Sequence, residues 1–269
     1  MNQKDIVAGL GEIGNPILKL LSKNSISIGF DIDKKLMNIK KFEKYANAQT
    51  KFLHICIPFG KNFEKNVLNL VDQFSPLIVV IHSTISPYTT SKLQEKLTVP
   101  VIYSATRGIH QRMLSDLKKY TKFYAIEKSA PKSSWASNEY RKLLKLSNVK
   151  SRKVSSPITL ELAKIVCDTS YYGWLINYAQ ISNMIANEHK VDYDEMWSFS
   201  DEIHKFLGNR PKMYPGYIGG HCVIPNLDLI HHQTLDLIKQ LNQNYLKKTP
   251  KAKSINKKYT KSKKQSYDV

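Results

Sequence analysis

A glycine-rich loop near the N-terminus has the residue types and the spacing of a phosphate-binding turn. It follows the apolar run 6–8 and precedes a stretch, 16–21, in which apolar residues recur with helical spacing. In such a loop one glycine permits the tight turn, another lets the backbone approach a diphosphate, and a third lets helix and sheet pack closely. We therefore expect the diphosphate of a dinucleotide to be bound by Gly9, Gly11, Glu12, Ile13 and Gly14.

An acidic residue at the end of the next apolar run would select the dinucleotide. Asp31 follows the run 26–30, where a carboxylate can accept hydrogen bonds from both ribose hydroxyls and repels a 2′-phosphate. This favours NAD over NADP, although Lys34 and Lys35 follow closely and weaken the preference. A glycine-rich turn that binds no ligand is the alternative interpretation.

Cys222 is a second candidate for chemistry, because its loop is unusually rich in glycine and proline. The segment 214–225 holds three glycines and two prolines, and His221 directly precedes the cysteine. A helix expected a few residues later would favour a thiolate through its dipole. These features are typical of an activated nucleophile, whereas most lone cysteines are small buried hydrophobic residues. The three cysteines are widely spaced, so neither a disulfide framework nor a metal site is predicted.

Residues 1–150 alternate between apolar runs and helix-like stretches, which is typical of a parallel sheet covered by helices. The predicted fold class is therefore α/β, with a Rossmann-type doubly wound parallel sheet that carries the NAD site. The predicted strands are 6–8, 26–30, 52–57, 77–81, 99–103 and 123–126. The predicted helices are 16–21, 34–44, 61–74, 88–97 and 134–147.

A smaller all-α domain is predicted for residues 151–246, where strand patterns cease. It opens with a helix that Ser156 caps and that reaches about residue 188, followed by a helix over 193–207. Asn226 is expected to cap the last helix of this domain.

Charge is concentrated in the tail 247–269, which holds nine lysines and one aspartate and so carries +8 of the net charge of +19. We expect this tail to be disordered, with a possible polyanion contact. The basic remainder suits an anionic ligand such as a nucleotide or phosphate, which fits a small-molecule substrate, or an acidic partner. No apolar run approaches the ~20 residues of a membrane span, so we expect a cytoplasmic protein without membrane insertion.

The loop around Cys222 resembles the Pro-Gly-x-Gly-x-Gly-Gly-His-Cys loop of the UDP-glucose/GDP-mannose dehydrogenase family. Further resemblance, in the expected order, covers roughly residues 4–245. The matching stretches are His54-Ile55-Cys56-Ile57-Pro58, Ile81-His82-Ser83-Thr84-Ile85-Ser86-Pro87 and Leu162-Ala163-Lys164-Ile165-Val166-Cys167-Asp168. The resemblance adds Pro58, Ser83 and Thr84 to the expected cofactor site.

The resemblance implies oxidation of a nucleotide-sugar alcohol to the acid in two hydride transfers to NAD. Cys222 would be the nucleophile, Lys164 would stabilise the oxyanion, and Thr84 would lie against the nicotinamide. Asp168 and His221 complete the candidate catalytic set. The resemblance also implies a homodimer that pairs through the long central helix.

Four features depart from the family pattern: the C-terminal nucleotide-sugar domain is absent, Asp168 replaces an asparagine, Asn226 replaces an aspartate, and Thr106 replaces an acid. A carboxylate near Cys222 would raise the pKa of its thiol. Oxidation of a simpler sugar or related alcohol or aldehyde is compatible with what remains. A non-catalytic NAD-binding or regulatory module and a polyanion-binding protein are the alternatives.

Overall fold

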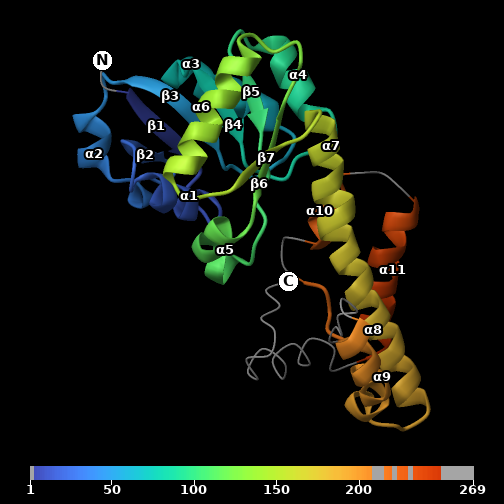
Figure 1. The fold of residues 1–269 in the computed structure, drawn as a ribbon. Coiled ribbons are helices and arrows are strands. Elements are labelled where there is room, and N and C mark those ends of the chain that lie inside the picture. Colours follow the sequence, from blue (N-terminus) through green and yellow to red (C-terminus); the bar gives the residue numbers. More distant parts are fainter. Residues whose placement is uncertain (1–2, 208–214, 220–222, 230–232, 250–269) are drawn as a thin grey trace. The chain divides into compact units, whose positions relative to one another are not determined.

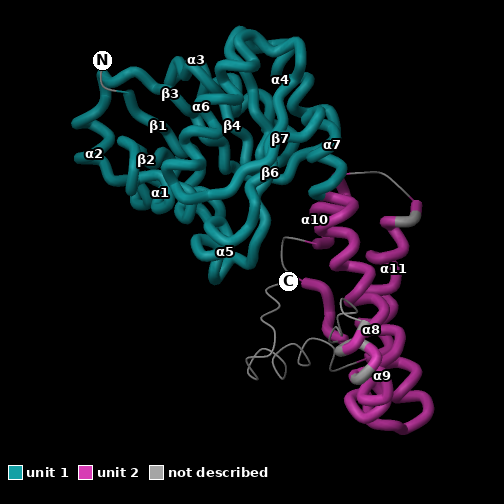
Figure 2. The backbone as a smooth tube through the Cα atoms, in the orientation of Figure 1, with its two compact units in different colours: residues 1–164 teal, residues 165–269 magenta. Residues whose placement is uncertain are grey.

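The computed structural model describes residues 3–207, 215–219, 223–229 and 233–249. The chain forms two compact units, residues 1–164 and residues 165–269 (Figure 2). The second unit thus starts later than the all-α domain expected at residue 151. Within the described residues, no helix is both long enough and apolar enough to cross a membrane.

The first unit is built on a seven-stranded sheet in the order β2-β1-β3-β4-β5-β6-β7 (Figure 1). Its strands are β1 (Gln3–Ala8), β2 (Ser27–Phe30), β3 (Gln49–Ile55), β4 (Ile78–Ile81), β5 (Val101–Tyr103), β6 (Lys122–Ile126) and β7 (Ser151–Lys153). Strand β1 pairs in parallel with both β2 and β3, so the chain changes direction across the sheet there. Open α/β sheets bind ligands at this kind of switch point, beyond the carboxyl ends of the strands.

The Rossmann-type α/β fold is confirmed, but two features of the sheet differ from the sequence-based prediction. Strand β6 runs antiparallel to β5, and β7, which was not predicted, pairs in parallel with β6. Apolar periodicity reports which residues are buried and does not report strand direction, which explains the difference. The parallel part from β2 to β5 carries the predicted cofactor loop.

Helices cover both faces of the sheet because successive strand residues point to opposite sides. Ile78 and Val80 pack on the side of α1 (Gly14–Leu21), α5 (Met113–Lys119) and α6 (Ser133–Leu146). Val79 and Ile81 pack on the side of α3 (Phe63–Phe74) and α4 (Thr89–Lys96). The helix predicted at 34–44 is divided into the 3₁₀ turn η1 (Lys34–Leu36) and α2 (Ile39–Lys44), and a further turn, η2 (His110–Arg112), precedes α5.

The long helix predicted from residue 157 to about 188 is interrupted. It consists of α7 (Pro157–Leu162), a π-helix, η3 (Ala163–Ser170), and α8 (Tyr171–Glu188). The predicted cap is confirmed, since the Ser156 hydroxyl accepts a hydrogen bond from the backbone N–H of Thr159. Short π segments in otherwise α-helical stretches occur frequently at functional sites.

The second unit packs α8 against α9 (Tyr193–Leu207), α10 (Val223–Leu227) and α11 (Gln233–Lys248). Its core joins Ile176 and Ala179 of α8 to Ile218, Leu227 and Ile238. Gly173 permits the close approach, since an added Cβ there would lie 3.2 Å from side-chain atoms of Ile238 and Val223. Asn226 lies within α10 and so does not cap the last helix as predicted. The tail from residue 250 onward lies outside the described residues.

Candidate functional site

The glycine loop follows β1 directly and leads into α1. Gly9 has φ +89°, a backbone conformation that glycine adopts readily, and an added Cβ at Gly14 would lie 1.6 Å from the carbonyl oxygen of Gly9. Gly11 is exposed, and an added Cβ there would meet no described atom within 4 Å. The first and third glycines therefore permit the turn itself, while the second leaves an open backbone surface. That division suits a loop that admits a diphosphate at a helix N-terminus.

Asp31 lies beside this loop at the end of β2. Its Oδ2 accepts a 2.6 Å hydrogen bond from the backbone N–H of Leu10, and its Oδ1 accepts one of 2.9 Å from that of Asp33. These bonds fix the carboxylate next to the diphosphate loop, as the sequence predicts for a ribose-binding acid. Each carboxylate oxygen retains a further lone pair for a ligand hydroxyl.

The neighbouring strand ends bring the other predicted cofactor residues to the same edge of the sheet. Cys56 follows β3, and its backbone N–H donates to the carbonyl of Ala8 at the end of β1. Burial raises the pKa of the Cys56 thiol to about 12, so it is a packing residue. Exposed Pro58 follows in the same connection.

Ser83 and Thr84 follow the end of β4. The Ser83 hydroxyl donates a 2.5 Å hydrogen bond to the carbonyl of Ile57, which ties this connection to the one after β3. Ser83 is buried and Thr84 is half-buried. Parallel strands expose their carboxyl ends at one edge, so the connection after β3 borders the switch point between β1 and β3, and the connection after β4 lies next to it.

A buried carboxylate anchors α7, the helix that leads to Lys164. Glu161 is fully buried and accepts hydrogen bonds from the backbone N–H groups of Tyr88 and Thr90 and from the Thr90 hydroxyl. Burial is the largest influence on its pKa, which lies above the ordinary value. Glu161 thereby holds α7 at the N-terminus of α4. Local sequence patterns give no sign of this role, because the contact joins residues more than 70 positions apart.

Lys164 and Asp168 both lie in the π-helix. Lys164 is half-buried and Asp168 is exposed. Burial is the main cause of the lowered pKa of Lys122, and the positive charges of Arg107 and Lys164 make smaller contributions in the same direction. Lys164 therefore lies in a positively charged part of the first unit, which suits the stabilisation of a developing oxyanion.

The remaining predicted catalytic residues, Cys222 and His221, lie outside the described residues. The segment just before them, residues 215–219, is described and is held by side chains of α8 and α11. The Asn242 amide makes two hydrogen bonds with Ile218: its Oδ1 accepts from the backbone N–H at 2.8 Å and its Nδ2 donates to the carbonyl at 3.0 Å. Gln180 donates to the carbonyl of Gly216, and the Tyr245 hydroxyl donates to that of Pro215.

Thr106 stands where the resembled family has an acid, and it is buried. Its hydroxyl oxygen accepts a 2.9 Å hydrogen bond from the ammonium group of Lys122, which also donates to the carbonyl of Ala105. The described residues contain no group of three or more His, Cys, Asp or Glu side chains suited to a metal ion.

Solved structures resemble this arrangement over most of the chain. The UDP-D-ManNAc dehydrogenase from Pyrococcus horikoshii matches with a TM-score of 0.73 and 19% identity, over 90% of this chain and 68% of that one. An NDP-N-acetyl-D-galactosaminuronic acid dehydrogenase from Methanosarcina mazei Go1 matches with a TM-score of 0.67 and 14% identity, over 91% and 66%. No family profile and no curated protein sequence matches the chain.

The chain has the fold of the UDP-sugar dehydrogenases. This dehydrogenase fold is also found in shorter enzymes. The 3-hydroxyisobutyrate dehydrogenase from Mycobacterium tuberculosis matches with a TM-score of 0.60 and 14% identity, over 100% of this chain and 96% of that one. The chain therefore spans nearly the full length of the 3-hydroxyisobutyrate dehydrogenase and about two thirds of the length of the two nucleotide-sugar dehydrogenases.

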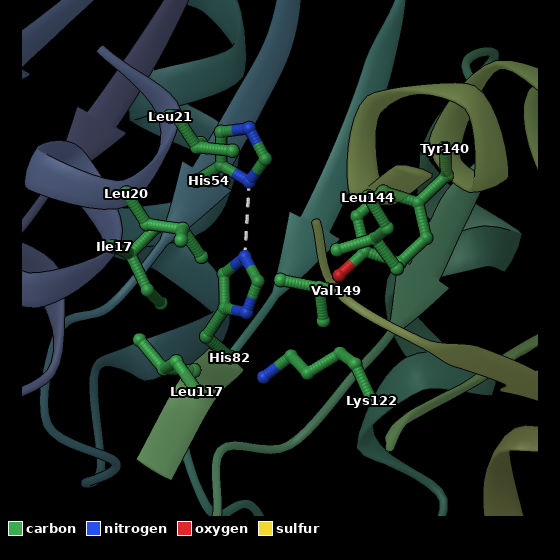
Figure 3. A pocket seen from close by; sticks show the side chains of 10 residues that line it. All are labelled: Ile17, Leu20, Leu21, His54, His82, Leu117, Lys122, Tyr140, Leu144 and Val149. Atoms are coloured by element: carbon green, nitrogen blue, oxygen red, sulfur yellow. Dashed lines mark hydrogen bonds between the residues drawn. The ribbon is translucent and has the colours of Figure 1, made fainter. Parts of the chain in front are cut away.

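A buried basic cluster, His54, His82 and Lys122, lies in the core of the dehydrogenase fold, and sequence reasoning missed it. His54 Nδ1 and His82 Nε2 are 2.9 Å apart, and Lys122 reaches toward the His82 ring (Figure 3). A cavity of about 20 Å³ adjoins them, bounded mainly by apolar side chains such as Leu20 and Leu117.

Burial lowers the pKa of each member of the basic cluster: to about 3 for His54, to about 7 for Lys122, and well below the ordinary value for His82. The signal in the sequence was a histidine within or just after an apolar run, at positions 54 and 82. Such a histidine can be recognised as buried, but its partner depends on strand pairing.

Proposed function

We propose that the chain is an NAD-dependent oxidoreductase that oxidises a sugar, nucleotide sugar or related alcohol. The observation that carries this proposal is the loop between Gly9 and Gly14, with the Asp31 carboxylate bonded to the N–H of Leu10. When bound there, NAD would supply the hydride acceptor. The loop backbone would hold the diphosphate, Asp31 would hold the ribose, and Ser83 and Thr84 would flank the nicotinamide.

Lys164 would act on the substrate in this proposal. Its ammonium group would stabilise the alcohol oxygen as that oxygen loses its proton. Loss of this proton together with transfer of a hydride to NAD would give an aldehyde. Cys222 would add to the aldehyde to form a thiohemiacetal, and transfer of a second hydride to a second NAD would oxidise that adduct to a thioester. Hydrolysis of the thioester by water would release the acid and the free thiol. The role of Lys164 is supported by its partial burial in a positively charged part of the first unit, whereas that of Cys222 rests on the sequence resemblance.

A second candidate is a single two-electron oxidation that does not use the thiol. The match to nearly the whole length of a 3-hydroxyisobutyrate dehydrogenase favours it, because that fold match needs no further domain. The two candidates differ in stoichiometry, since oxidation to the acid yields two NADH per substrate and oxidation to the carbonyl yields one.

The test follows NADH formation over a panel of nucleotide sugars, sugar alcohols and small hydroxy acids. Lys164→Ala should lower turnover by about 100-fold or more, by the loss of oxyanion stabilisation. Cys222→Ala should abolish only the second oxidation, with Cys167→Ala, at an exposed cysteine, as the matched control. NAD binding without NADH formation from any substrate, together with an unreactive Cys222, would instead indicate a non-catalytic module.

We also propose a homodimer through α8. Three large side chains at seven-residue spacing on this helix are exposed: Tyr171 by 54%, Tyr178 by 63% and Ile185 by 47%. Seven residues make about two helical turns, so the three lie along one face. Light scattering should give a dimer for the natural chain and a monomer for Tyr178→Glu. A monomeric natural chain would contradict the proposal.

A further inference from the structure

The glycine loop carries a carboxylate of its own, which is unusual chemistry for an anion site. Glu12 lies between Gly11 and Gly14, and its side chain is 53% exposed. A negative charge at this place would repel a bound diphosphate, because like charges at close range disfavour one another. The loop therefore needs a compensating group if it is to hold a dinucleotide.

His110 provides that group. Its Nδ1 lies 2.7 Å from Oε2 of Glu12, and its side chain is only 18% exposed. The contact joins the loop after β1 to the η2 turn, almost 100 residues further along the chain. No local sequence pattern links the two segments, so the pair is visible only in the fold.

The turn that presents His110 is itself built around a buried carboxylate. Asp116 is 2% exposed, and its Oδ2 accepts hydrogen bonds from the backbone N–H of Ile109 at 3.0 Å and from Arg112 Nε at 3.1 Å. Gly108 has φ +142°, and an added Cβ there would lie 2.8 Å from the Cβ of Asp116. Asp116 thus holds the backbone just before His110 and the side chain of Arg112 just after it, which positions the η2 turn that carries the imidazole.

We propose that His110 is a residue of the dinucleotide site that offsets the charge of Glu12 and so favours binding of the diphosphate. This inference rests on the proposed function, because it requires that the loop binds a dinucleotide. His110 acts through Glu12 and through the field at the loop, and takes no part in the redox chemistry. The ligand group that it favours is the diphosphate, which NAD, ADP-ribose and ADP share.

A double-mutant cycle tests the proposal by titration calorimetry with NAD. His110→Ala should weaken NAD binding about fivefold, the equivalent of about 1 kcal/mol for a partly exposed hydrogen bond to a carboxylate. In the Glu12→Gln background the same change should weaken binding less than about twofold, since the charge to be offset is gone. Added salt should reduce the fivefold effect, because it screens the interaction.

Two controls keep the outcome specific. The ion pair between Lys96 and Glu64, at 2.6 Å in the same unit, serves as the matched pair, and its cycle should leave NAD affinity unchanged. Adenosine, which lacks the diphosphate, should bind the His110→Ala variant as well as the natural chain, whereas ADP-ribose should show the full loss. Thermal melting identifies a variant that fails to fold, and His110→Gln then replaces His110→Ala in the cycle.

Equal losses in both Glu12 backgrounds, or an equal loss for adenosine, would overturn the inference, since His110 would then act only on the general structure of the loop. Absence of any loss for NAD would overturn it as well. In these cases the natural chain still binds NAD, so the proposed function survives. If the natural chain itself does not bind NAD, the proposed cofactor site and the inference both fail.

Discussion

The two units hold their cores together with different kinds of buried polar group. In the first unit the basic cluster of His54, His82 and Lys122 can gain or lose protons. In the second unit the amide cluster, defined as Asn177, Gln180, Asn242 and Tyr245, is built mainly of groups that stay neutral at ordinary pH. The difference means that solution pH should act on the stability of the first unit far more than on that of the second.

The clusters also differ in how well their polar atoms are satisfied. In the basic cluster, His54 Nε2 and His82 Nδ1 have no hydrogen-bond partner among the described residues. Because one ring donates to the other, a neutral pair leaves one outward nitrogen as a donor and the other as an acceptor. In the amide cluster, Asn242 uses both of its amide atoms, and Asn177 Oδ1 is the unpartnered atom among those described.

Removal of Asn242 should have the largest effect on stability. Asn242→Ala leaves the buried N–H and carbonyl of Ile218 without partners, which should lower the free energy of unfolding by about 3 kcal/mol. The loss should be the same at neutral and mildly acidic pH. Chemical denaturation measures it, with Asn244→Ala, at an exposed position on the same helix, as the control. If the loss of free energy of unfolding in Asn242→Ala varied with pH, the amide cluster would not be the pH-insensitive one of the two clusters.

Acid should destabilise the first unit through its histidines. The folded pKa of His54 is about 3, below its ordinary 6.5, so the unfolded chain binds protons first as the pH falls. Through His54 alone, stability is present above pH 6.5 and is lost toward pH 3, by about 2 kcal/mol between about pH 6.5 and pH 5, and the lowered pKa of His82 acts in the same direction. His54→Gln with His82→Gln should flatten this dependence, and His189→Gln, at an exposed histidine, should not. If the stability of the double variant depended on pH as strongly as that of the natural chain, the two histidines would not be the cause of the acid sensitivity.

Asp5 should give a smaller effect of the opposite sign. It is 4% exposed, and burial raises its pKa to about 6 from 3.8. The fold favours the protonated form of Asp5. This group therefore stabilises the folded state fully below pH 3.8, and the stabilisation is lost as the pH rises through about 6. Asp5→Asn should therefore raise the free energy of unfolding by about 1–2 kcal/mol near pH 8 and have little effect near pH 4. Asp72→Asn, at an exposed position, is the control. An equal gain in the free energy of unfolding at pH 4 and pH 8 would contradict the raised pKa of Asp5.

Local patterns predicted the parts of the site that local physics determines. Gly9, Gly14 and Asp31 were predictable because a tight turn demands glycine and because the acid follows at a fixed distance along the chain. The antiparallel direction of β6 was not predictable, because a buried strand has the same apolar sequence pattern whichever way it runs. The pairs His54–His82 and Glu12–His110 depend on contacts between residues 28 and 98 positions apart, which only the folded sheet brings together. The role of Cys222 stays a prediction.

A crystal structure of the full chain with NAD bound tests the proposed cofactor site most directly. We expect the diphosphate to lie against the backbone N–H groups of Gly11, Glu12 and Ile13, with the ribose hydroxyls on the Asp31 carboxylate. A dinucleotide bound elsewhere, or a glycine loop that stays empty at saturating NAD, would contradict it.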